Sequence, residues 1–123
     1  MNILEIIKSA KSQNRIKGKI GETLAINFLE DQGYKILETN YSNKIGEIDI
    51  IAKDNDRIVF IEVKERASAK FGYPREAVNY YKQQKIQMVA NCYLKNKRLM
   101  DSYIRFDVIE ILAGNLTHLK NAF

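Results

Sequence analysis

Apolar side chains recur at helical spacing near the start of the chain, at Ile20, Leu24, Ala25, Phe28 and Leu29. This spacing predicts an amphipathic helix whose apolar face packs against the rest of the domain. Gly33 follows the last of these positions and is typical of the residue that ends a helix. A second, longer helix is predicted over residues 75–97, because Pro74 suits a helix start and the following residues favour helix.

The remaining apolar residues alternate or cluster between turn-forming residues, a pattern that predicts β-strands. The predicted strands cover residues 34–41, 46–53, 57–65 and 102–112, with an edge strand at 116–119. The turns that join the first three strands are too short for a crossover, so these strands should form an antiparallel meander. The long helix then supplies a right-handed crossover, which makes the fourth strand parallel to an earlier one. The expected class is α/β, a mixed sheet with helices packed on it.

The composition fits one folded domain. The chain has 123 residues, 46% of them hydrophobic, with one proline and six glycines. It has no run of about 18 apolar residues, and its apolar start is too short and too charged for a signal peptide. A single cysteine excludes an internal disulfide and gives no reason to expect secretion. These features predict a cytoplasmic protein with no membrane contact.

The net charge and the scarcity of histidine and cysteine limit the partners and the catalytic groups that can be expected. The formal net charge of +5 favours an anionic partner such as nucleic acid, although an ordinary basic protein explains it equally well. With one histidine and one cysteine, the chain is a weak candidate for histidine triads and thiolate metal clusters. Any catalysis should therefore rest on carboxylates and lysines.

The third predicted strand carries two charges, Glu62 and Lys64, in an apolar setting. Alternate residues of a strand share a face, so these two emerge together while Val63 points the other way. Hairpin pairing can place Asp49 beside Glu62, and Glu22 lies at the edge of the apolar face of the first helix. Such carboxylates suit Mg²⁺ or Mn²⁺, and an adjacent lysine suits phosphodiester hydrolysis. Solvated charges on an amphipathic strand are the competing explanation.

This arrangement resembles the PD-(D/E)XK nuclease superfamily, with Asp49 at the position of the motif's aspartate and Glu62-Val63-Lys64 at its (D/E)-x-K. More closely, the chain is similar to the YraN family of bacterial proteins, which is itself similar to archaeal Holliday junction resolvases. The matching stretches are Gly21-Glu22 with Ala25 and Leu29, 33–37, Asn40-Tyr41, 46–52, 59–64, Arg66, 71–72, 77–78, Lys85, 105–108 and 121–123.

The resemblance implies a restriction-endonuclease-like fold with an αβββαβ core, a single domain over residues 15–123. The segment 1–14 before it is poorly matched, and a short helix is expected at residues 3–8. The resemblance also implies that Glu22, Asp49 and Glu62 are ligands of Mg²⁺ or Mn²⁺ and that Lys64 is the catalytic lysine.

Further basic residues are candidates for nucleic-acid contact. Those in or near the loop after the third strand, where they alternate with aromatic residues, are Arg66, Lys70 and Arg75, and those on the long helix are Lys82 and Lys85. Basic and aromatic side chains together can bind phosphates and stack on bases. The competing explanations are an ordinary loop and solvated helix lysines. Glu47 is either an acidic neighbour of Asp49 or a charge at the sheet rim, and Asp107 is expected to pair with Arg105 or Lys85 in a structural role.

The expected function is that of a metal-dependent endonuclease acting on DNA, with branched DNA in repair or recombination as a candidate substrate. A non-catalytic nucleic-acid-binding module on the same fold is the first alternative. An interaction protein with purely structural carboxylates is the second. A homodimer is compatible with the resemblance to resolvases.

Overall fold

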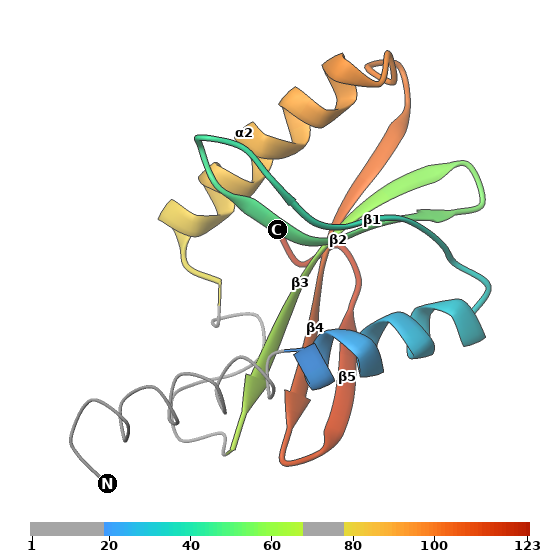
Figure 1. Ribbon diagram of the computed structural model, residues 1–123, viewed down its shortest axis with the longest axis vertical. Helices are drawn as coiled ribbons and strands as arrows, with labels where there is room; N and C mark the ends of the chain where they lie inside the picture. The colour runs from blue at the N-terminus through green and yellow to red at the C-terminus, as the bar shows by residue number, and fades with distance from the viewer. Residues whose placement is uncertain (1–18, 68–77) are drawn as a thin grey trace, which may run out of the picture.

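Two helices and a five-stranded sheet make up the part of the chain that the computed structural model describes, residues 19–67 and 78–123. The N-terminal helix, residues 19–31, and α2, Tyr80–Asn96, cover opposite faces of the sheet (Figure 1). The predicted mixed α/β class is therefore confirmed. The helix predicted at residues 3–8 and the domain boundary at residue 15 lie outside the described residues.

The sheet has the strand order β1-β2-β3-β4-β5. The strands are β1 Lys35–Ser42, β2 Glu47–Asp54, β3 Arg57–Arg66, β4 Tyr103–Leu112 and β5 Asn115–Leu119. The first three strands form the predicted antiparallel meander, and β4 is parallel to β3, as the crossover through α2 requires. The edge strand β5 returns antiparallel to β4. Observed strand limits differ from the predicted ones by about one residue, a usual uncertainty at element ends.

Each face of the sheet has its own apolar core. On the α2 side, Phe60 and Ile58 of β3 pack with Ile86, Val89 and further residues of the helix. On the other side, the alternate residues of β3 pack with the N-terminal helix, as shown by Val59, Ile61 and the half-buried Val63. Strand β3 is therefore buried on both faces. Glu62 and Lys64 share the face of Ile58 and Phe60, so they project toward the α2 side and not into open solvent.

The N-terminal helix is rotated relative to the prediction. Ala25 and Leu29 are buried as expected, but Ile20 and Leu24 are 52% and 45% exposed. Gly21 lies on the inward side of the helix instead: it is buried, and an added Cβ would be 3.6 Å from Cδ1 of Ile111 on β4. A glycine there lets the helix backbone approach the sheet, so the stripe that starts at Gly21 faces inward. Larger apolar neighbours turn outward.

Strict alternation also fails at the start of β2. It predicts that Ile48 and Ile50 share a face, but Ile48 packs in the α2-side core with Ile51, whereas Ile50 packs on the other side. The pairing of β2 with β3 begins only at Ile50↔Ile61, so the residues before Ile50 are not held to the pleat of β3. The irregular stretch includes Asp49.

A buried ionic network fixes the C-terminal part of the chain to the sheet. Asp107, fully buried, accepts from Nε and Nη2 of Arg105 at 2.9 and 3.0 Å and from the backbone N–H of Asn121 at 2.9 Å. His118 Nε2 lies 2.7 Å from its Oδ2. Despite burial, which acts in the opposite direction, the hydrogen bonds from His118, Arg105 and Asn121 lower the pKa of Asp107. The predicted pairing with Arg105 is confirmed, and the role is structural.

Removing the carboxylate that accepts these hydrogen bonds should destabilise the protein strongly. We expect Asp107→Ala to reduce the free energy of unfolding by about 3–5 kcal/mol, because the Arg105 guanidinium would remain buried without its main partner. The exposed pair of Lys97 and Glu38, 3.9 Å apart, is the control, and Glu38→Ala should cost less than about 1 kcal/mol. Urea unfolding of both variants measures the difference, and similar small losses in the two would contradict this reading of the network.

Candidate functional site

Asp49 and Glu62 come together where β2 separates from β3. The paired register of the two strands ends at Ile50↔Ile61. Beyond that point the N–H of Val63 donates to Oδ2 of Asp49, at 2.9 Å, where a ladder bond would otherwise go to a backbone carbonyl. Asp49 is half-buried and Glu62 only 6% exposed. The separation of the strands thus holds one carboxylate by a backbone bond and places it against another.

The electrostatics of this pair are unfavourable. The pKa of Asp49 is raised from its ordinary value of 3.8 to about 7, first by burial and then by the charge of Glu62. The hydrogen bond from Val63 acts in the opposite direction, and the charge of Glu22 adds a smaller increase. Two carboxyl groups so close share a proton readily or require a cation between them.

Glu22 reaches the site from the N-terminal helix. Its Oε2 accepts from Nδ2 of Asn40 at 3.1 Å, and its charge acts on Asp49. Asn40 has a φ of 51°, in the left-handed region, which asparagine tolerates better than most residues. The strand β1 thus supplies the residue that holds Glu22, a role that sequence reasoning missed. Asn40-Tyr41 is one of the stretches that match the family, and this match is the feature of the sequence that points to Asn40.

A pocket of about 320 Å³ opens beside the carboxylates. Its lining residues are Ile45, Gly46, Glu47, Asp49, Glu62, Lys82, Lys85 and Ile86. Nζ of Lys82 lies 2.5 Å from Oε1 of Glu62, and Nζ of Lys85 lies 5.0 Å from the centre of the Tyr81 ring. Both of the α2 lysines expected near the site therefore line the pocket. Lys82 also contacts Glu62, which the sequence does not predict.

Lys64 follows Glu62 on the same face of β3 and is half-buried. Within residues 19–67 and 78–123, no ion pair or hydrogen bond engages its ammonium group. Arg66, two residues further, forms an ion pair of 2.5 Å with the buried Glu110 of β4, and its side chain is 11% exposed. That contact directs the charge of Arg66 toward the sheet. Lys70 and Arg75 lie outside the described residues.

The donor set suits a hard divalent cation only in part. Asp49 and Glu62 are adjacent carboxylates, and Mg²⁺ is commonly held by one or two carboxylates together with water. In the described ranges, however, no three acidic, histidine or cysteine side chains are grouped to hold a metal ion. Glu22 acts on the pair through its charge without completing such a group. The residues therefore fit a site with two protein ligands.

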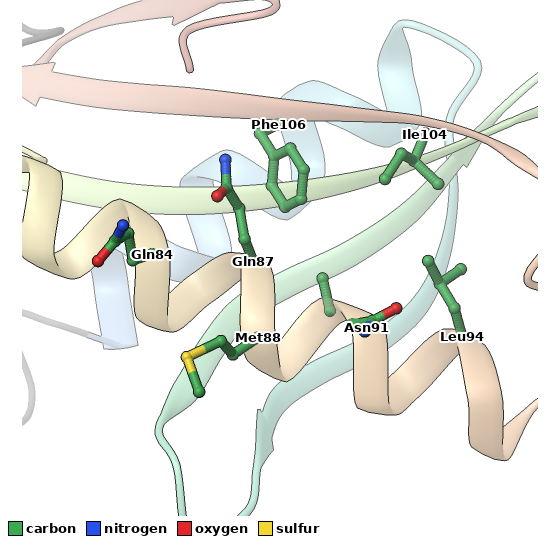
Figure 2. Close-up of a pocket in the computed structure, with 8 residues that line it drawn as sticks. Gln84, Gln87, Met88, Asn91, Leu94, Ile104 and Phe106 are labelled. Atoms are coloured by element: carbon green, nitrogen blue, oxygen red, sulfur yellow. The ribbon is translucent and has the colours of Figure 1, made fainter.

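A larger pocket, of about 550 Å³, lies elsewhere, between α2 and β4 (Figure 2). Figure 2 shows Met88, Leu94, Ile104 and Phe106 around it, together with the amides of glutamine and asparagine side chains. None of its lining residues is ionisable, so it offers no acid, base or nucleophile. Of these two pockets, only the smaller one is lined by ionisable side chains. In addition, neither described helix is long and apolar enough to cross a membrane.

The fold and the site define a class: a small α/β protein with a mixed five-stranded sheet and an acidic pair facing helix lysines. A family model, that of the uncharacterised protein family UPF0102, matches residues 21–111. The chain belongs to this family, which confirms the sequence resemblance to the YraN family.

Relatives match over nearly their whole length. A UPF0102 protein of Clostridioides difficile is 52% identical over 112 residues, covering 89% of this chain and 98% of that protein. UPF0102 proteins of Thermodesulfovibrio yellowstonii and Persephonella marina are 53% and 45% identical, over 86% and 88% of this chain and 94% and 93% of theirs. The crystal structure of SSO0001 matches with a TM-score of 0.46 and 20% identity, over 95% of this chain and 58% of that one. That likeness is too slight to identify a fold.

The raised pKa of Asp49 predicts a pH dependence of stability in the absence of divalent metal. The folded chain keeps a proton that the unfolded chain releases near pH 4, so this contribution is present at low pH and lost as pH rises toward about 7. Relative to Asp49→Asn, which retains an oxygen to accept from Val63, the wild type should lose on the order of 3 kcal/mol across this window. Urea unfolding of both proteins in chelator measures it. Parallel stability curves would show that the pKa is not raised.

Proposed function

We propose that this protein is a Mg²⁺- or Mn²⁺-dependent endonuclease that hydrolyses phosphodiester bonds of DNA on a restriction-endonuclease-like fold. The observation that carries the proposal is the contact of Asp49 with Glu62 at the separating ends of β2 and β3, with Lys64 two residues further on the same face. The order of a carboxylate, a second carboxylate and a lysine is that of the PD-(D/E)XK motif.

Asp49 and Glu62 are the residues that would hold the metal, with Glu22 adding negative charge nearby. A bound divalent ion would supply charge neutralisation at a phosphate and a more acidic water. The chain itself contributes positioning. Val63 fixes the Asp49 carboxylate through its N–H, Asn40 fixes Glu22, and β3 holds Lys64 beside Glu62. Lys64 would orient the attacking water or stabilise charge on the phosphate.

Positive charge near the pocket supports a polyanionic substrate. Lys82 and Lys85 line the pocket from α2, and the chain as a whole carries a formal net charge of +5. Such charges attract nucleic acid in a salt-dependent way without reading its sequence. Branched DNA is the candidate substrate carried by the resemblance to junction resolvases.

A non-catalytic nucleic-acid-binding module is the second candidate. It is favoured by the absence of a ready group of three ligands among the described residues and by the engagement of Glu62 with Lys82. Under this alternative, the acidic pair would be a retained structural feature and DNA would bind through the lysines.

A cation-dependent nicking assay on plasmid and branched DNA separates the two candidates. We expect cleavage with Mn²⁺ or Mg²⁺ that falls by about a hundredfold or more in Glu62→Ala and in Lys64→Ala, because each removes a group at the reacting phosphate. Glu65→Ala is the matched control, since Glu65 lies on the same strand but near Gly21 of the N-terminal helix, and it should cleave like the wild type. DNA binding without cleavage under either metal would reject the enzyme and support the module.

A further inference from the structure

The contact between Lys82 and Glu62 has an unusual setting on the helix. Lys82 is the third residue after Asn79, the N-cap of α2, whose side chain accepts from the Lys82 backbone N–H at 2.9 Å. The N-terminal end of a helix carries partial positive charge and favours acidic residues. The first turn of α2 contains no acidic residue, and Lys82 places a full positive charge there. The helix alone therefore disfavours this lysine, and its contact with Glu62 compensates.

The two partners of the ion pair are exposed to very different degrees. The side chain of Glu62 is 7% exposed and that of Lys82 is 41% exposed. The carboxylate is thus fixed inside the protein, whereas the ammonium reaches it from the solvent side on a flexible stem. Movement of Lys82 is sufficient to break the pair without any change in the sheet.

The pair occupies the oxygen that the proposed function requires for a metal. Oε1 of Glu62 lies 2.5 Å from the ammonium, and Asp49 adjoins Glu62 on the other strand. A divalent ion between these carboxylates would need Glu62 and would repel a cation in contact with it. The ammonium and the metal therefore compete for the same carboxylate.

We propose that Lys82 is a built-in competitor of the metal, which neutralises Glu62 until a divalent ion displaces it toward the mouth of the pocket. The inference rests on the proposed function, because it assumes the metal site at Asp49 and Glu62. Displacement frees a positive charge at the pocket where the phosphate of a nucleic acid would lie. By linkage, a polyanion that binds the released Lys82 strengthens metal binding, and the metal strengthens polyanion binding.

Mn²⁺ binding followed by calorimetry, in mildly alkaline buffer without DNA, tests the competition. Lys82→Gln should bind Mn²⁺ about tenfold more tightly than the wild type, because the competing charge is gone. Lys82→Arg, which keeps the charge, should bind like the wild type. Lys85→Gln is the matched control: it removes the same charge from the same pocket, but Lys85 lies against Tyr81. It should tighten binding by less than about threefold, as expected for a screened charge.

The outcomes distinguish this inference from the proposed function. Equal tightening in Lys82→Gln and Lys85→Gln, or weaker binding in Lys82→Gln, would overturn the competition while leaving the metal site intact. Absence of Mn²⁺ binding in the wild type and all variants would overturn the metal site, and with it this inference.

A measurement on the wild-type side chain covers the case in which Lys82→Gln fails to fold. Lysines labelled by reductive ¹³C-methylation retain their charge, and the Lys82 signal is assigned by its loss in Lys82→Arg. On saturation with Mg²⁺ this signal should shift to the position of a solvated lysine, with little change at Lys53, an exposed residue of β2. A Lys82 signal that does not move while Mg²⁺ binds would refute displacement.

Discussion

The constraint on which the site depends is the repulsion between Asp49 and Glu62. Two carboxylates lie together in a region mostly withdrawn from water, and the pKa of Asp49, raised to about 7, reflects both burial and the neighbouring charge. Several features of the fold keep them there: the separation of β2 from β3, the N–H of Val63 and the ammonium of Lys82. Such an arrangement costs stability, and carboxylates with perturbed pKa values cluster at functional sites.

The other buried aspartate of the sheet shows what a structural carboxylate looks like in this protein. Asp107 is fully buried, yet its pKa is lowered because Arg105, His118 and the N–H of Asn121 all donate to it. Asp49 is less buried and has a backbone donor, but the charge that acts on it most strongly is that of another carboxylate. Burial alone therefore does not distinguish the two. The sign of the surrounding charge does, and it marks Asp49 as the functional candidate.

The sequence predicts the fold well and the site in part, for physical reasons. Alternation placed Glu62 and Lys64 on one face of β3, and a short hairpin placed Asp49 next to Glu62, because both depend on local geometry. The prediction that Ile20 and Leu24 face the sheet is wrong. Gly21 packs on the inward side of the N-terminal helix, and a glycine adds nothing to the hydrophobic pattern from which that face is predicted. The contacts of Asn40 with Glu22 and of Lys82 with Glu62 join residues far apart in the chain, which spacing cannot reveal.

The two lysines nearest Glu62 differ in how they are held, and this difference divides their roles under the proposed function. Lys64 is part of a strand buried on both faces, so its backbone position is fixed relative to Glu62. Lys82 reaches the same carboxylate from the first turn of a helix, with much of its side chain in solvent. A group that must act on a reacting atom benefits from the first kind of support, because catalysis depends on fixed geometry. A group that must leave when another cation arrives requires the second, and that assigns the positioned chemistry to Lys64 and the exchangeable charge to Lys82.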